Sequence, residues 1–148
     1  MAALGHDPLP AFLPPRESRE TQPALAERYP LTLISPPAHQ FLNSTFVNVE
    51  SLRRRAGAPS LRIHPDDAAP RGIAEGAQVR CFNDRGGFLA AAVVTAEVKR
   101  GVVQAPSVWW GRFTSDGANA NETTSSALTD LGGGATFYDN LVEVAPAD

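Results

Sequence analysis

Two polar stretches of this sequence carry side chains that could hold a ligand. The first, SPPAHQFLNST, covers residues 35–45 and follows a short apolar run. It is full of hydroxyl, imidazole and amide groups and contains no charged carboxylate, lysine or arginine. The second, WWGRFTSDGANANETT, covers residues 109–124 and combines aromatic faces, a guanidinium, amides and hydroxyls. Because loops on a rigid scaffold commonly carry function, the two stretches are candidates for a binding site.

The first stretch offers six candidate binding residues, which are Ser35, His39, Gln40, Asn43, Ser44 and Thr45. If Ser44 or Thr45 opens a helix that carries Phe46, the free N–H groups of its first turn would face a bound anion. The alternative is that residues 43–45 only cap that helix. The two interpretations are compatible, because one side chain can cap while neighbouring amides bind.

The second stretch offers Trp110 and Arg112 as candidates. Arg112 is expected to pair either with a ligand anion or with Asp116, and the sequence leaves both possibilities open. Trp109 is interpreted as a core or interdomain packing residue, since tryptophan more often packs than forms a ligand platform.

Composition limits the classes of protein to which the chain can belong. Its 148 residues, 43% of them apolar, predict one globular domain with an ordinary core. The formal charge of −3 gives no general attraction to nucleic acid or to an anionic membrane. Cys81 is the only cysteine, so no internal disulfide forms. No apolar stretch approaches the roughly 18 residues of a membrane span, and the first residues lack the basic-then-apolar order expected of a secretory signal. We expect a cytoplasmic location, or a periplasmic one if a larger parent protein carries a signal.

Residues 1–28 differ from the rest and are predicted to form a Pro-rich linker or strap, called the leader below. Six of the thirteen prolines lie in the first thirty residues, which disfavours both strands and a long helix. Leu9, Phe12 and Leu13 are its candidate anchors on a neighbouring surface. Residues 29–148 are predicted to form the folded domain.

The folded domain is predicted to be mainly β with short helices. Six short apolar or alternating runs predict strands near residues 29–35, 61–63, 77–84, 87–98, 101–106 and 140–146. Glycines at 86–87 and 101 are expected to supply positive φ in the turns. One helix is expected to carry Phe46, Val49 and Leu52 on one face, and another to start at His64-Pro65 and stop at Gly72. Many short strands with small helices between them favour a closed, mixed barrel.

Several motifs in order resemble the C-terminal dinucleotide-binding domain of molybdopterin oxidoreductases, the family of dimethyl sulfoxide reductases and formate dehydrogenases. The resemblance covers residues 29–144. The most specific parts are the Asn-Asp-Arg-Gly turn at residues 83–86 and a segment with seven matching residues, namely Pro65, Asp67, Ala68, Arg71, Gly72, Ile73 and Gly76. The implied fold is a six-stranded double-psi β-barrel of the aspartate decarboxylase-like type.

The resemblance also implies a function for the polar loops. Such a domain binds the guanylate-bearing pterin arm of a molybdenum or tungsten cofactor, molybdopterin guanine dinucleotide. The domain implied is the C-terminal part of a larger, formate dehydrogenase-like oxidoreductase, whose preceding domains are its partners and hold the metal. Asn121 and Thr124 match an Asn-x-Leu-Thr pattern whose Asn contacts the pterin, although Thr123 replaces the usual aliphatic residue. We therefore expect a monomeric module with no catalytic residue and no metal ligand of its own.

Other interpretations are weaker. A stand-alone double-psi barrel that binds proteins or carries a cofactor is the main alternative, and it would display an exposed apolar patch. Cys81 sits at an alternating strand position, which favours a small buried apolar residue over a nucleophile. The cations at residues 53–55 are interpreted as a solvated helix end, because no aromatic residues interleave them.

Overall fold

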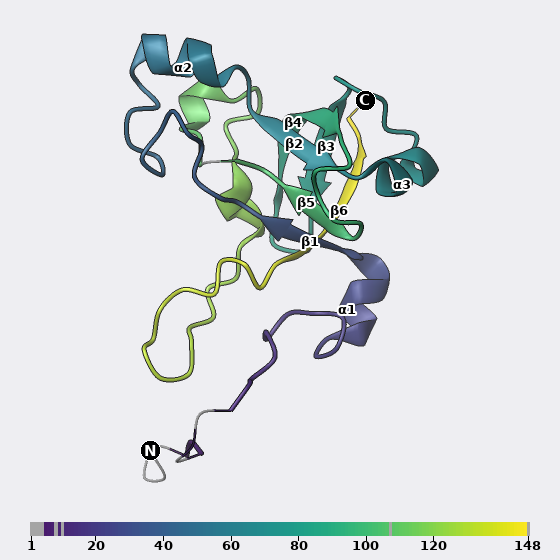
Figure 1. Cartoon of the computed structure of the whole chain (residues 1–148), viewed down its shortest axis with the longest axis vertical. Coiled ribbons are helices and arrows are strands. Elements are labelled where there is room, and N and C mark those ends of the chain that lie inside the picture. The colour runs from purple at the N-terminus through teal and green to yellow at the C-terminus, as the bar shows by residue number, and fades with distance from the viewer. Residues whose placement is uncertain (1–4, 8, 10, 107, 148) are drawn as a thin grey trace.

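The computed structural model describes residues 5–7, 9, 11–106 and 108–147, which form a closed six-stranded barrel with short helices outside it (Figure 1). Around the barrel the strand order is β1-β5-β2-β4-β3-β6. Two neighbouring pairs, β1 with β5 and β2 with β4, are parallel, and the other pairs are antiparallel. The strands are β1 (Leu31–Ile34), β2 (Ser60–Ile63), β3 (Gln78–Phe82), β4 (Gly87–Val94), β5 (Val102–Gln104) and β6 (Leu141–Pro146). The predicted double-psi β-barrel is confirmed.

The barrel interior is filled by alternate residues of the strands. Leu61 and Ile63 of β2 and Val79 of β3 are fully buried, as the period of two in a strand requires. Cys81 is also fully buried, and burial raises the pKa of its thiol. A thiol held protonated in an apolar core is unreactive, so the interpretation of Cys81 as a small buried apolar residue is confirmed.

In the described part of the chain, three α-helices lie outside the barrel: α1 (Pro23–Arg28), α2 (Glu50–Ala56) and α3 (Pro65–Ala68). The helix start predicted at His64 is confirmed, because His64 Nδ1 accepts the backbone N–H of Asp66 at 3.1 Å. The stop at Gly72 is also confirmed, since this glycine ends the following 3₁₀ turn at φ 67°. No helix of the described residues is long and apolar enough to cross a membrane.

The prediction that a helix carries Phe46 is wrong, because the helix starts later in the chain. Asn43 and Phe46 have φ values of 53° and 74°, which a right-handed helix excludes. Leu42 and Thr45 instead exchange two backbone hydrogen bonds of 3.2 and 2.8 Å, which closes a tight turn. The helix α2 begins only at Glu50 and has no side-chain cap. Residues 43–45 therefore neither cap α2 nor present its free amides to a ligand.

The hairpin predicted between β3 and β4 is confirmed, but the reason for its glycines differs from the expected one. Gly101 has the positive φ that was predicted, at 80°, whereas Gly86 and Gly87 do not. Both are glycine because other atoms approach closely. A Cβ at position 86 would lie 2.9 Å from the Glu122 carbonyl oxygen, and one at position 87 would lie 2.8 Å from Phe82 Cβ.

Gly87→Ala is expected to lower the free energy of unfolding by about 1–3 kcal/mol, because the added methyl overpacks the start of β4. Besides Phe82 Cβ, it would meet the Cys81 carbonyl oxygen at 2.9 Å. Urea denaturation of the purified chain measures the loss. The matched control is Gly132→Ala, whose Cβ meets nothing closer than 3.8 Å, and which we expect to change stability by less than about 0.5 kcal/mol. Equal losses in the two variants would contradict this account.

The leader meets one end of the barrel through α1 and the residues just before it, and its more N-terminal described residues extend away from the barrel (Figure 1). Leu9, Phe12 and Leu13 are exposed, so they do not anchor the leader on this domain, and their contact with another surface stays a prediction. The buried leader residue is Glu17, which binds Arg85 of the β3–β4 turn and the backbone of β6. Residues 1–4, 8 and 10 of the leader lie outside the described part of the chain, and the domain boundary at residue 28 stays a prediction.

Candidate functional site

The two polar stretches leave the barrel from the same end. The stretch at residues 35–45 follows β1, and the stretch at residues 109–124 comes after β5. These two strands are parallel neighbours, with Ile34 opposite Gln104, so their ends lie side by side. The Ala105 N–H donates to the Ile34 carbonyl at 3.0 Å just where they diverge. Figure 1 shows both segments with α2 on the side of the barrel opposite α3.

A small aromatic core joins the two stretches. Phe41 and Trp109 are buried against each other edge to face, with ring centroids 5.2 Å apart, and Val47 completes the cluster. The predicted packing role of Trp109 is thereby confirmed. Next to this core, Trp110 Nε1 donates to the Ser44 carbonyl at 2.7 Å. Trp110 therefore uses its only polar group to fasten the first stretch to the second.

Arg112 stands on an aromatic platform at the surface. Its guanidinium lies 4.8 Å from the ring centroid of Trp110 and 4.7 Å from that of Phe113. The alternative of an Asp116 ion pair is not realised, because that carboxylate accepts the backbone N–H groups of Leu89 and Ala118 instead. Among the described residues Arg112 forms no ion pair, so its exposed cation is open to an anionic ligand.

A second arginine contributes to the platform, and the sequence did not reveal it. Arg53 also lies over the Phe113 ring, 4.0 Å from its centroid, and donates to the Val47 carbonyl at 3.0 Å. The interpretation of residues 53–55 as a solvated helix end is therefore wrong for Arg53, which is half-buried. The contact joins segments far apart in sequence, and three consecutive arginines carry no signal of it.

Asn121 and Thr124 lie in and next to a 3₁₀ turn, η4 (Ala120–Thr123). Asn119 fastens this turn to the aromatic core, because its Nδ2 donates to the Trp109 carbonyl at 3.1 Å and its Oδ1 accepts the Asn121 N–H at 3.0 Å. The Asn121 side chain is exposed, whereas the Thr124 hydroxyl already donates to the Ala120 carbonyl. Asn119 is a positioning residue that the sequence did not single out.

The donor set fits a polar ligand with an anionic part. Besides Arg112, six of the candidates have side chains that form no hydrogen bond with another described residue, namely Ser35, His39, Gln40, Ser44, Thr45 and Asn121. They add hydroxyl, imidazole and amide groups to the Arg112 cation and the aromatic faces. Such a set matches planar heterocycles joined by phosphates better than an apolar ligand.

Comparison with known proteins agrees with this chemistry. Residues 31–141 match the family model described as "Molydopterin dinucleotide binding domain". A probable oxidoreductase of Bacillus subtilis is 37% identical over 116 residues, covering 78% of this chain and 17% of that protein. The dimethyl sulfoxide reductase of Escherichia coli is 35% identical over 142 residues, covering 93% of this chain and 17% of its own length.

A solved structure shows the same fold. Acetylene hydratase from Pelobacter acetylenicus superposes with a TM-score of 0.82 at 20% identity, over 99% of this chain and 22% of that one. At 20% identity this match is evidence for the fold only. In each of these comparisons the chain spans less than a quarter of the length of its match.

Proposed function

Because the chain belongs to the family of molybdopterin dinucleotide-binding domains, we propose that its two polar loops hold the guanylate-bearing arm of a molybdopterin guanine dinucleotide cofactor. The observation that carries this proposal is the convergence of both loops on one aromatic core, with the free Arg112 cation beside it. The metal would be held elsewhere in a larger protein, and the chain itself would not be catalytic.

Each part of the site has a proposed role. Arg112 pairs with the diphosphate, since a guanidinium binds phosphate oxygens with charge-assisted hydrogen bonds. The exposed amide of Asn121 contacts the pterin, and His39 and Gln40 bind further polar groups of the ligand, as do Ser35, Asn43, Ser44 and Thr45. Trp110 would offer its ring face, because its Nε1 is already bonded to Ser44, and Thr124 would offer its hydroxyl oxygen as an acceptor. When bound, the cofactor supplies the redox chemistry, and the protein fixes its orientation.

For the parent enzyme we propose a molybdenum-dependent oxidoreductase. The relatives include dimethyl sulfoxide reductases of Escherichia coli and Rhodobacter capsulatus, which favours reduction of a sulfoxide or N-oxide over the formate dehydrogenase-like activity expected from the sequence. The proposed partners are its preceding domains. An apolar groove between the leader and residues 129–139, with Phe12, Phe137 and Tyr138 exposed along it, offers a surface for them.

Guanosine diphosphate, the nucleotide half of the cofactor, provides a direct test on the chain itself. Titration into the ¹⁵N-labelled protein is expected to shift amide signals within residues 35–45 and 109–124. Arg112→Gln is expected to weaken the binding by about tenfold or more, because a charge-assisted contact to phosphate is lost. His39→Ala and Asn121→Ala should lower the nucleotide affinity by more than they lower the free energy of unfolding.

The matched control is Arg54→Gln, which removes the same charge from the nearby helix α2, where Arg54 pairs with the exposed Glu50 at 3.6 Å. It should leave the affinity nearly unchanged. Shifts concentrated outside the two stretches, or equal losses in both arginine variants, would contradict the assigned site.

A further inference from the structure

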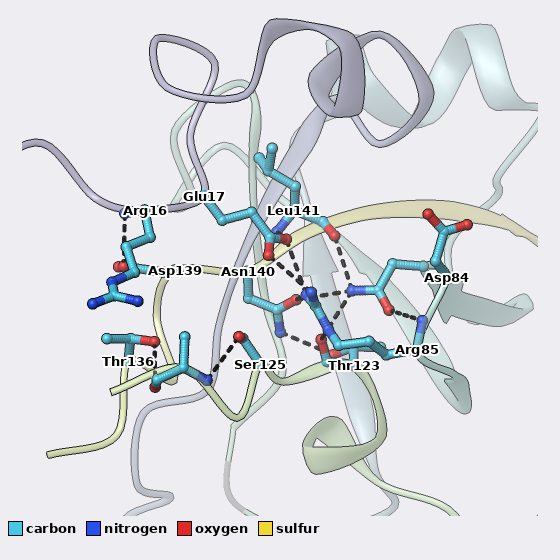
Figure 2. A network of polar contacts seen from close by, with 12 residues as sticks. Arg16, Glu17, Asp84, Arg85, Thr123, Ser125, Thr136, Asp139, Asn140 and Leu141 are labelled. Atoms are coloured by element: carbon cyan, nitrogen blue, oxygen red, sulfur yellow. Dashed lines mark hydrogen bonds and ion pairs between the residues drawn. The ribbon is translucent and has the colours of Figure 1, made fainter. Parts of the chain in front are cut away.

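We propose that Glu17 of the leader, acting through Arg85, is a positioning residue that holds the turn carrying Asn121 in place for ligand binding. The inference rests on the proposed function, because Asn121 is a ligand contact only there. It concerns a polar network that lies between the leader, the β3–β4 turn and the start of β6 (Figure 2).

Arg85 is the centre of this network. Its NH1 and NH2 groups donate to the two carboxylate oxygens of Glu17, each at 2.9 Å, in a bidentate ion pair. Its Nε donates to the Thr123 carbonyl at 2.6 Å. One planar guanidinium therefore links the leader directly to η4, and its geometry fixes both contacts at once.

Thr123 is held by two further side chains. Asn83 Nδ2 donates to its carbonyl at 2.9 Å, and Asn140 Nδ2 donates to its hydroxyl at 2.9 Å. Thr123 is fully buried, and its hydroxyl donates in turn to the Ala120 carbonyl. Thr123 replaces the aliphatic residue usual in the family, and both its carbonyl and its hydroxyl have hydrogen-bond partners.

Glu17 is the contribution of the leader to this network. Its side chain is only 9% exposed, and Oε1 also accepts the Leu141 N–H at 2.7 Å. A buried carboxylate needs such partners, and in return it orients Arg85 toward Thr123. Gly86 adds a steric fit, because its missing Cβ allows the Glu122 carbonyl to approach the turn.

The position of Asn121 therefore depends on contacts made by the residues on both sides of it in the sequence. Asn119 ties the turn to the aromatic core on one side, and Thr123 ties it to Arg85 and Glu17 on the other. Loss of the second tie would free η4 to open without unfolding the barrel, because local segments open at lower cost than the whole fold. The leader is in this way part of the binding site rather than a mere connection.

Solvent exchange of backbone amides, measured by NMR on the ligand-free chain, tests the positioning role. The Glu122 and Thr124 N–H groups donate to the Asn119 and Asn121 carbonyls and report on η4 directly. Glu17→Gln is expected to speed their exchange by about tenfold, while the barrel amides of Ala92 and Ala105 change by less than about twofold.

Two further variants keep the test sharp. Arg85→Lys can still pair with Glu17 but cannot also reach the Thr123 carbonyl, so it should speed the same two amides. Asp84→Asn is the matched control, because it breaks the other ion pair between the leader and this turn, Arg28–Asp84, whose side chains are 59% and 54% exposed. It should leave Glu122 and Thr124 unchanged. A uniform rise over all barrel amides, or no rise at η4, would overturn the proposal.

Guanosine diphosphate titration separates this inference from the proposed function. If the unmodified chain binds the nucleotide at its polar loops, Glu17→Gln should weaken that binding severalfold. Unchanged affinity despite faster exchange at η4 would overturn the link to the ligand. If the unmodified chain shows no binding, the proposed function fails, and the exchange measurements still decide whether Glu17 holds the turn.

Discussion

Asn83→Asp is expected to lower the free energy of unfolding by about 3 kcal/mol, measured by urea denaturation at neutral pH. The side chain lies in the β3–β4 turn, where its Oδ1 accepts the Arg85 N–H at 3.0 Å. This bond directs the amide nitrogen to three acceptors, the Thr123 and Leu141 carbonyls and Asn140 Oδ1, at 2.9 to 3.1 Å. In the variant, a carboxylate oxygen would face those three oxygens with no proton to share.

Acid should partly reverse the effect. Below the pKa of the introduced carboxyl, its O–H could donate to one of the three acceptors, so the difference from the unmodified chain should shrink. The matched control is Asn48→Asp, the same chemical change at an exposed position, expected to alter stability by less than about 0.5 kcal/mol. A loss at Asn83 no larger than at Asn48 would show that this hydrogen-bond network contributes little to stability.

The barrel was predictable because its information is local. Apolar or alternating residues indicate each strand. A proline and two carboxylates within one turn indicate the helix that starts at His64. The pattern of short strands favoured a closed, mixed barrel, and the resemblance to the family added its six-stranded double-psi type. Period, turn chemistry and order along the chain were sufficient for this part of the fold.

The differences arose where individual contacts, within a loop or between distant segments, override the pattern of residue types. Phe46 and Val49 have helical spacing, yet Phe46 follows the tight turn closed by Leu42 and Thr45 and has positive φ. Within this domain the buried leader residue is Glu17, whose carboxylate is satisfied by Arg85 and the Leu141 amide, and its apolar residues Leu9, Phe12 and Leu13 are exposed. A sequence without pairing information cannot reveal which distant groups meet.

Most of the motif residues that carry the resemblance stabilise the barrel and its turns. The buried Asp67 accepts the Gly101 N–H at 2.6 Å, and Arg71 pairs with Glu143 of β6 at 2.6 Å. Asn83 and Arg85 hold Thr123. The candidate ligand contacts lie instead in the less patterned loops, which explains why the motifs identify the family better than they identify the site.

Trp109→Ala is expected to lower the free energy of unfolding by about 3–5 kcal/mol, the usual range when a buried Trp is truncated. Trp109 is 6% exposed and forms a buried cluster with Phe41 and Val47, against which Phe113 packs. Its removal leaves a cavity where the two polar stretches meet, and its carbonyl also anchors Asn119. Guanosine diphosphate affinity should therefore fall together with stability, which urea denaturation and nucleotide titration can each measure.

Trp109→Phe provides the comparison that assigns the effect to packing. A phenyl ring can keep the edge-to-face contact with Phe41, now 5.2 Å between centroids, so about half of the stability loss should be recovered. Nucleotide affinity should recover in parallel, because the same contact holds both stretches together. If the phenylalanine variant regained stability but not affinity, the indole itself would contact the ligand, and Trp109 would belong with Trp110 and Arg112 among the binding residues.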